Sequence, residues 1–368
     1  MPEGIDVAFS VDALGPQLTG IGRYSLELAL GLRGSRDVRQ VSYFRGNDWL
    51  TDPTLALNGD WRAPAGRMRR NLAHWRGRFG ARKAIVHGPN YFLPSWASGG
   101  VITVHDLSVL LYPETHPIER VKDFQLRFKD SLDRSRLIIT DSNTVRQELI
   151  DTLGIEPERV CSVPLGVDVP SAAAAPIDGV LNRYQLAPGC YTLCVSTFEP
   201  RKRIAQLVAA YEQIPNALRL RYPLVLVGAI GWLNEALNSR ISDAESAGWL
   251  KRLNFVPDET RDALYRGARL FVYPSVYEGF GLPPLEAMAH GIPTIIGDAA
   301  TLVEVTKGAA LVVCADDCEG FAELIASVLQ DETLRSIASE NGRQVACEYT
   351  WAKCLASTVA VYKRLAVS

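Results

Sequence analysis

Short apolar runs alternate with longer amphipathic stretches along nearly the whole chain, and this pattern predicts strands separated by helices. Short β-branched and apolar runs are typical of strands buried on both faces, as in a parallel sheet. The predicted strands of the first half are residues 5–10, 84–87, 101–105, 137–141 and 160–163. The predicted helices are residues 22–32, 117–133 and 143–153. This half therefore predicts one doubly wound α/β unit.

A second series follows a small-residue stretch at residues 171–176, which we predict to be a linker. Its predicted strands are residues 191–196, 224–228, 253–256, 270–274, 294–296 and 310–313. Two such series predict two Rossmann-like, doubly wound domains facing a central cleft. We predict an N-terminal domain, a C-terminal domain and a final helix at residues 1–170, 177–348 and 349–368. Functional residues are expected in the loops after the strands, where such sheets bind ligands.

Composition sets limits on the class of protein. A chain of 368 residues with 47% hydrophobic and 22% charged content suits a globular enzyme with two cores. The net charge of -2 gives no overall attraction to nucleic acid. Seven cysteines, an odd number, favour reduced thiols over a disulfide framework. With no apolar run of about 18 residues and no visible export signal, we expect a cytoplasmic protein.

The segment YPSVYEGFGLPPLEAMAHGIPTI, residues 273–295, places two glutamates on either side of a glycine-rich turn. Glu278 follows a predicted strand, and Gly279 and Gly281 precede a short predicted helix. The N–H groups at such a helix start suit a phosphate. Glu286, expected in the first helical turn, can accept hydrogen bonds from both hydroxyls of a ribose. Taken alone, either glutamate could equally be a helix-capping or solvated residue.

Two prolines refine this prediction, because either Pro283 or Pro284 suits the first position of the helix. Gly291 is expected to end the helix. We include Phe280 and Leu282, which complete the turn, among the residues of a predicted nucleotide-sugar site.

Two cations follow an earlier strand of the same half, in CVSTFEPRKRIAQLVAAYEQI at residues 194–214. Arg201 and Lys202 lie between that strand and an amphipathic helix, and together they could neutralise a diphosphate. A solvated basic turn is the alternative. A third turn, LVGAIGWLNEAL, brings Gly228 to a helix start, although it lacks the full G-x-G-x-x-G spacing.

These motifs resemble a known family. The run EGFGLPPLE, with EPRK upstream and VPDETRDALYRGARLFVYPS between them, resembles the C-terminal nucleotide-binding domain of retaining glycosyltransferase family 4, which has the GT-B fold. In the first half, TGIGRYSLELALGL, TVHDLSVLLYPE and ITDSNTVRQEL resemble that family's first loop, its histidine-bearing loop and its next turn. The last helix, YTWAKCLASTVAVYKRL, resembles the segment that crosses back to the N-terminal domain. The likeness covers nearly the whole chain.

The resemblance implies roles for the residues of the second half. Glu286 would bind the ribose hydroxyls of the donor, and Glu278 would contact the transferred sugar. Arg201 and Lys202 would bind the diphosphate and stabilise the charge that develops as it leaves.

The resemblance also implies roles in the first half. His105 would lie near the donor sugar, although a loop histidine satisfied by backbone is the alternative. Gly20 and Gly22 would let the first loop approach the phosphates. The chain has no D-x-D triplet, so we expect no metal and no cofactor beyond the nucleotide diphosphate sugar that serves as donor. The resemblance further implies retention of the anomeric configuration.

A basic segment at residues 61–83 carries eight basic residues and no acid, interleaved with aromatic and apolar residues. Such a stretch suits an anionic membrane surface or a lipid-diphosphate acceptor. A solvated loop and nucleic-acid binding are the alternatives, but no nucleic-acid motif accompanies it and we expect no such partner. The residues selected as membrane or acceptor contacts are Arg69, Arg70, Trp75, Arg76 and Arg78.

The leading hypothesis is a retaining, metal-independent glycosyltransferase that moves a hexose onto a glycan or polyprenyl-diphosphate-linked acceptor in cell-surface polysaccharide or lipopolysaccharide synthesis. Mannose from GDP-mannose is the expected donor, because GWLNEAL and YEGFGLPPLEAM resemble mannosyl- and rhamnosyltransferases. The expected location is the cytoplasm, including the inner face of the plasma membrane. The alternatives are a nucleotide-sugar 2-epimerase and a non-catalytic GT-B scaffold subunit.

Overall fold

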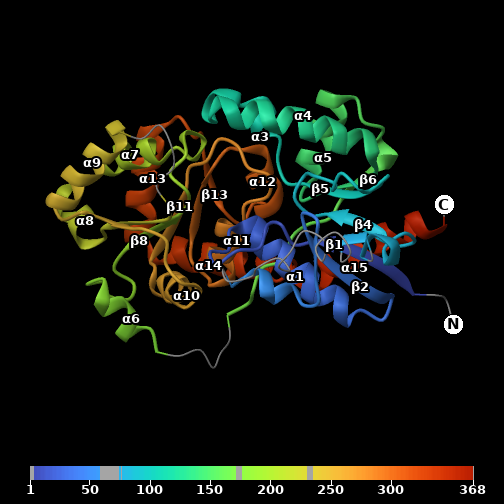
Figure 1. Cartoon of the computed structure of the whole chain (residues 1–368). Coiled ribbons are helices and arrows are strands. Elements are labelled where there is room, and N and C mark those ends of the chain that lie inside the picture. The colour runs from blue at the N-terminus through green and yellow to red at the C-terminus, as the bar shows by residue number, and fades with distance from the viewer. Residues whose placement is uncertain (1–3, 59–73, 76, 171–175, 230–234, 368) are drawn as a thin grey trace. The chain divides into compact units, whose positions relative to one another are not determined.

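The structure, a computed structural model, describes residues 4–58, 74–75, 77–170, 176–229 and 235–367 (Figure 1). The chain divides into two compact units. Unit 1 comprises residues 1–113, 117–166 and 350–368, and unit 2 comprises residues 114–116 and 167–349. The predicted linker at residues 171–176 lies, except for its last residue, outside the described residues.

Unit 1 is built on a seven-stranded sheet in the order β3-β2-β1-β4-β5-β6-β7. Its strands are β1 (Ile5–Ser10), β2 (Val38–Arg45), β3 (Asp48–Leu50), β4 (Ile85–Gly88), β5 (Gly100–Val104), β6 (Ser135–Thr140) and β7 (Val160–Ser162). The pairs are parallel, apart from the antiparallel pair β2–β3. Its helices are α1 (Gly20–Gly34), α3 (Ser108–Leu111), α4 (Ile118–Arg134), α5 (Asn143–Leu153) and α15 (Trp351–Val367), with 3-10 turns η1 (Pro53–Ala56) and η3 (Pro157–Arg159). The 3-10 turn η2 (Pro113–Thr115) begins at the last residue of a unit 1 segment and continues into residues assigned to unit 2.

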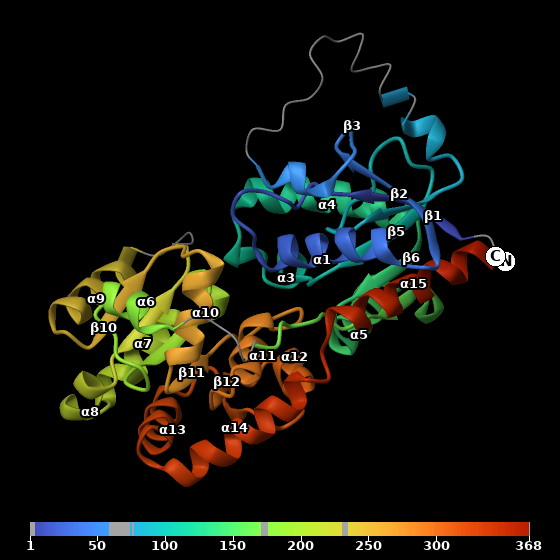
Figure 2. The ribbon, with the colours of Figure 1, turned by 90° about the horizontal axis from the view of Figure 1, so that it is seen from below.

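The last helix, α15, completes unit 1 by packing against α1, as Figure 2 shows. The contact is close because position 31 is a glycine: a Cβ on Gly31 would lie 2.8 Å from a methyl group of Leu355. Tyr362 of α15 is fully buried, and its hydroxyl lies 2.6 Å from Nδ1 of His87 on β4. Burial lowers the pKa of His87 to about 3, so this histidine is neutral inside the unit.

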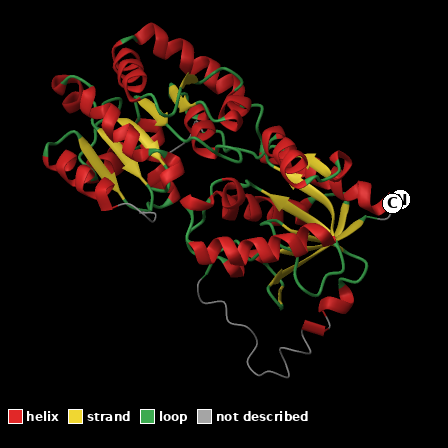
Figure 3. Ribbon diagram, turned by 90° about the horizontal axis from the view of Figure 1, so that it is seen from above, coloured by secondary structure: helices red, strands yellow, loops and turns green. Residues whose placement is uncertain are grey.

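Unit 2 is built on a six-stranded parallel sheet in the order β10-β9-β8-β11-β12-β13. Its strands are β8 (Thr192–Val195), β9 (Leu224–Val227), β10 (Leu250–Leu253), β11 (Leu270–Tyr273), β12 (Thr294–Gly297) and β13 (Leu311–Val313). Its helices are α6 (Asp178–Arg183), α7 (Ile204–Gln213), α8 (Asn216–Arg221), α9 (Glu235–Ser246), α10 (Asp258–Gly267), α11 (Leu282–Ala289), α12 (Ala300–Thr306), α13 (Cys318–Gln330) and α14 (Glu332–Ala346), with the 3-10 turn η4 (Pro200–Lys202). Helices flank the strands of each sheet (Figure 3).

In each sheet, successive strands are first added on one side of the first strand and then on its other side. We call the place between these two sides the reversal point. In unit 1 the chain runs from β1 outward to β2 and then returns to β4 on the other side of β1. In unit 2 it runs from β8 outward to β10 and then returns to β11 beside β8. The loops after the two flanking strands separate at such a point and leave a crevice that binds ligands in open α/β sheets.

The predicted class of two Rossmann-like domains is confirmed, but three strands were not predicted correctly. The strand predicted at residues 253–256 is wrong, since β10 spans Leu250–Leu253 and pairs with β9 along that length. Because β10 is an edge strand, it can contain the charged residues Lys251 and Arg252. A search for apolar runs therefore did not detect it. The same search missed β2 and β3, where polar residues interrupt the apolar ones.

Gly228, directly after β9, cannot carry a side chain without strain. Its φ is 147°, and a Cβ there would lie 1.9 Å from the carbonyl oxygen of Ser196. We therefore expect Gly228→Ala to lower the free energy of unfolding by more than about 2 kcal/mol, measured by urea denaturation. The control is Gly189→Ala in the same unit, where φ is also positive but nothing lies within 4 Å of the added Cβ. Equal losses in the two variants would contradict the steric explanation.

Candidate functional site

Two cations and a glutamate predicted from the sequence meet at the reversal point of unit 2. Arg201 and Lys202 lie on η4, after β8, and Glu278 lies in the loop after β11. Nζ of Lys202 donates to Oε1 of Glu278 at 2.5 Å, and Nη1 of Arg201 lies 3.6 Å from Oε2. Lys202 and Glu278 are each only 7% exposed. The amide of Val276 also donates to the carbonyl of Arg201 at 3.1 Å, so main chain as well as side chains join the two loops.

The electrostatics of this cluster are balanced. Burial acts to raise the pKa of Glu278, but the charges of Lys202 and Arg201 outweigh it and hold that pKa below its ordinary value. Burial lowers the pKa of Lys202, and the neighbouring Arg201 lowers it further. Glu199 accepts from Nε of Arg201 at 3.1 Å, so two cations face two carboxylates. An anionic ligand that reached these cations would therefore share them with the two glutamates.

The ammonium of Lys202 is suited to such sharing. It has three N–H donors, of which one is bonded to Glu278 and another to the hydroxyl of Tyr273 at 3.1 Å. The third has no partner among the residues that the structure describes. Lys202 can therefore bind an additional oxygen without breaking its pair with Glu278.

Glu286, the second predicted glutamate, lies on α11 and is oriented by a tyrosine that the sequence did not single out. The hydroxyl of Tyr265, on α10, donates to Oε2 of Glu286 at 2.9 Å. His290 stacks on the Tyr265 ring, and its Nε2 lies 2.9 Å from Oδ1 of Asp262. Each carboxylate oxygen accepts two hydrogen bonds, so Glu286 keeps capacity for two ligand hydroxyls while Tyr265 fixes its rotamer.

The start of α11 differs from the prediction. The helix begins at Leu282, so both Pro283 and Pro284 lie in its first turn and Glu286 lies in the second. Proline has no backbone N–H, and the first turn therefore offers only the Leu282 amide instead of the expected set of donors. Gly281 precedes the helix with φ of 102°, and Gly291 follows it with φ of 71° as expected. The start of α11 therefore offers fewer backbone donors for an anion than the sequence analysis predicted.

The remaining predicted residues of unit 2 have structural explanations. Phe280 is buried and its ring packs edge-on against Tyr349 at 5.7 Å, and Gly279 is buried beside it. Leu282 is partly exposed at the helix start. Gly228 is required by its approach to Ser196, whatever it does toward a ligand.

His105, predicted near the donor sugar, follows β5 and uses both ring nitrogens inside unit 1. Nδ1 lies 2.7 Å from Oδ2 of Asp141, and Nε2 lies 2.9 Å from the carbonyl of Pro89. A carbonyl only accepts, so Nε2 carries a proton. Burial acts to lower the pKa of His105, but the Asp141 charge outweighs it and raises that pKa. The ring therefore holds the loop after β5 in place and has no nitrogen left for a sugar hydroxyl.

Gly20 and Gly22 open α1, in the loop region after β1. Gly20 is exposed at the first position of the helix, and the amide of Gly22 donates to the Thr19 side chain at 3.3 Å. A Cβ on Gly22 would lie 3.1 Å from both the Ala13 carbonyl and a Leu18 methyl group. Gly22 is thus a packing glycine, whereas the Gly20 backbone is accessible.

The basic segment is described only in part. Arg69, Arg70 and Arg76 lie outside the described residues. Trp75 is 63% exposed, its ring stacks on that of Phe79 at 5.7 Å, and Arg78 is exposed. Among the described residues, no helix is long and apolar enough to cross a bilayer, and no group of three potential metal ligands occurs.

Comparisons with known proteins agree with this architecture. Residues 18–170 match the family "Glycosyltransferase Family 4", and residues 189–345 match "Glycosyl transferases group 1". The chain is 36% identical to O-antigen chain mannosyltransferase B of Escherichia coli, over 98% of this chain and 100% of that protein. It is 26% identical to O-antigen chain mannosyltransferase RfbU of Salmonella typhimurium, over 87% of this chain and 90% of that protein.

A solved structure shows the same fold. WaaG, a glycosyltransferase involved in lipopolysaccharide biosynthesis, superposes with a TM-score of 0.69 at 15% identity, covering 96% of this chain and 99% of WaaG. The fold and these similarities define an enzyme of the glycosyltransferase class with GT-B architecture. Within that class, the chain belongs to the family that joins a Glycosyltransferase Family 4 domain to a Glycosyl transferases group 1 domain.

The buried Lys202–Glu278 pair yields a stability prediction. Lys202→Met leaves Glu278 buried with a weaker partner, so we expect the free energy of unfolding to fall by about 3 kcal/mol at neutral pH, measured by urea denaturation. The double variant Lys202→Met/Glu278→Gln should recover part of this loss, because it removes the uncompensated charge. A double variant that loses the full sum of the single changes would show that the two side chains do not interact.

Proposed function

We propose that this glycosyltransferase transfers mannose from GDP-mannose, with retention of configuration and without a metal ion, in the synthesis of a cell-surface polysaccharide. The observation that carries the proposal is the cluster of Arg201, Lys202 and Glu278 at the reversal point of unit 2. Similarity to O-antigen mannosyltransferases along the whole chain supports mannose as the sugar and a glycan as the acceptor.

The proposal gives a role to four charged residues of unit 2. Arg201 and Lys202 bind the diphosphate, and Glu286 accepts the ribose hydroxyls of the nucleotide. Glu278 contacts the transferred sugar while it holds Lys202. Negative charge grows on the departing diphosphate, so both cations act more strongly in the transition state than in the bound donor. Each charge-assisted hydrogen bond contributes about 1.5 to 3 kcal/mol.

The acceptor is proposed to be a glycan on a polyprenyl-diphosphate carrier at the inner face of the plasma membrane. The exposed Trp75 and Phe79, in a segment rich in arginine, support contact with such a surface. Arg69, Arg70, Arg76 and Arg78 belong to the same segment and are proposed to contact anionic lipid or the carrier diphosphate.

Nucleotide binding tests the donor site. In a thermal-shift panel of GDP, UDP, ADP and TDP, we expect GDP to stabilise the protein most, by about 2.7 kcal/mol at 100 times its Kd. Glu286→Ala should abolish the shift and Tyr265→Phe should reduce it, because Tyr265 only orients the carboxylate. Glu323→Ala, which removes an exposed glutamate of α13, serves as the control and should leave the shift intact. A larger shift with UDP than with GDP would reject the guanine assignment.

Product analysis tests the reaction. With GDP-mannose and a glycan acceptor, we expect the initial rate to be unchanged by excess EDTA, because protein cations neutralise the leaving group. Proton NMR of the product should show the α configuration of the donor. Activity lost in EDTA and restored by Mn²⁺ would refute the metal-free proposal, and a β-linked product would refute retention.

A further inference from the structure

A basic groove crosses unit 1 at the edge of the sheet where its parallel strands begin. The groove has a volume of about 980 Å³. It is lined by the first residues of β1, β4 and β5, which are Ile5, Ile85 and Gly100, and by Leu365 near the end of α15. Figure 2 shows the start of β1 close to the end of α15. His105 and the glycines of α1 follow the opposite ends of their strands, so the groove lies apart from the residues of this unit that were predicted to approach the donor.

The charges in the groove do not balance. Its lining includes two acidic side chains, and each is paired: Asp6 with Arg39, and Asp37 with Lys363 at 2.8 Å. Four further cations complete the charged lining and form no ion pair within the part of the chain that the structure describes. These are Arg36, Arg82, Lys83 and Arg136. All four are exposed, and they give the groove a net charge of +4 in a chain whose net charge is -2.

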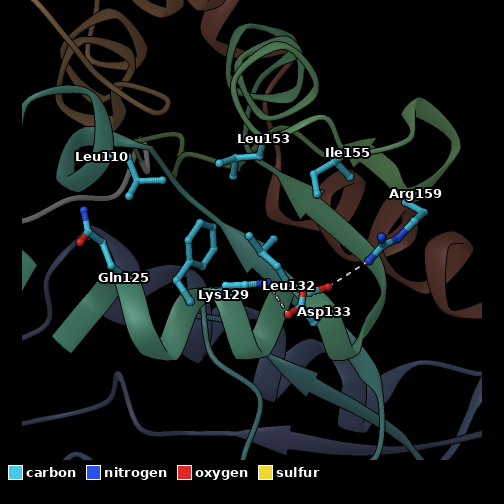
Figure 4. A pocket seen from close by; sticks show the side chains of 9 residues that line it. Leu110, Gln125, Lys129, Leu132, Asp133, Leu153, Ile155 and Arg159 are labelled. Atoms are coloured by element: carbon cyan, nitrogen blue, oxygen red, sulfur yellow. Dashed lines mark hydrogen bonds and ion pairs between the residues drawn. The ribbon is translucent and has the colours of Figure 1, made fainter. Parts of the chain in front are cut away.

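Another hollow of the same unit provides a contrast. A pocket of about 290 Å³ beside α4 is lined by apolar side chains such as Leu132 and Leu153 (Figure 4). Its charged rim is internally satisfied: Lys129 pairs with Asp133 at 2.8 Å, and Arg159 donates to main-chain carbonyls. Unpaired positive charge is therefore a property of the groove and not of every hollow in the unit.

An aromatic pair adjoins the groove. The guanidinium of Arg82, which lines the groove, lies 5.6 Å from the centre of the Phe79 ring, and that ring stacks on Trp75. The two rings are 59% and 63% exposed. Aromatic side chains favour the interface between water and lipid, and clustered lysines and arginines attract anionic headgroups. Few soluble anions would need two large apolar surfaces beside a groove of cations.

We propose that this groove binds the phosphate headgroups of an anionic lipid bilayer, with Trp75 and Phe79 inserted at the bilayer surface beside it. The inference rests on the membrane contact proposed above for Trp75 and Phe79, and it deepens that proposal by naming the groove cations as the headgroup site, none of which belongs to the donor site. It also gives the sheet of unit 1 two different edges. The edge where the strands begin faces lipid, and the edge where the strands end remains accessible to a sugar acceptor.

Vesicle co-sedimentation of the full chain tests the proposal. We expect binding to vesicles that contain phosphatidylglycerol, little binding to pure phosphatidylcholine, and weaker binding as salt rises. The variant Arg36→Gln/Lys83→Gln/Arg136→Gln should partition roughly 100-fold less into the anionic vesicles, since each cation near such a surface contributes about fivefold. Lys122→Gln/Arg183→Gln/Arg221→Gln, which removes three exposed cations elsewhere, is the matched control and should bind as the wild type does.

The GDP thermal shift of the groove variant separates this proposal from the donor assignment. If the groove variant keeps the GDP thermal shift but no longer binds anionic vesicles, the result supports headgroup binding by the groove. If GDP stabilises neither the wild type nor any variant, the result contradicts the proposed donor and leaves the lipid proposal unaffected. Wild-type protein that ignores anionic vesicles, or a groove variant that binds them as well as the control does, would overturn the inference. Binding of a single-stranded RNA oligonucleotide without vesicle binding would overturn it in favour of nucleic acid.

Discussion

The ion pair between Lys202 and Glu278 is the constraint on which the candidate site depends. It joins the loops after β8 and β11. In the described sheet of unit 2, these two strands are adjacent although they are not consecutive in sequence. Buried charges are tolerated only when they are paired and hydrogen-bonded, and here Tyr273 and Arg201 complete the pairing. If the two loops separated, each buried charge would lose its partner, and the free-energy cost of an unpaired buried charge therefore favours the joined arrangement.

Much of this architecture is local in origin and was therefore predictable. The alternation of short apolar runs and amphipathic helices is a property of neighbouring residues, and it correctly predicted two Rossmann-like units. It also placed Arg201, Lys202 and Glu278 in loops at the carboxyl ends of strands, where the structure brings them together. The edge strand β10 was misplaced because exposure at a sheet edge relaxes the demand for apolar residues.

Partners distant in sequence were not predictable in the same way. Tyr265 lies 21 residues before Glu286, and Asp141 lies 36 residues after His105. Nothing local in either segment indicates the contact. Asp141 had a usable signal, because the strands predicted at residues 101–105 and 137–141 end at His105 and Asp141, and the structure pairs β5 with β6. The helix α11 begins at Leu282, one or two residues before the predicted start at Pro283 or Pro284, and both prolines therefore fall where free backbone donors were expected.

The packing of α15 determines when unit 1 can be completed. Residues 350–368 belong to the unit that begins the chain, although all of unit 2 is synthesised between them and the earlier segments. On the ribosome, residues 1–166 therefore emerge without the helix that packs Leu355 against Gly31 and bonds Tyr362 to His87. Domains generally fold as units in the order of their synthesis, but here unit 2 has all its residues before unit 1 does. The face of α1 that packs on α15 and the side chain of His87 stay uncovered until residues 350–368 are synthesised, so the nascent unit 1 exposes apolar surface for that interval, as aggregation-prone folding intermediates do.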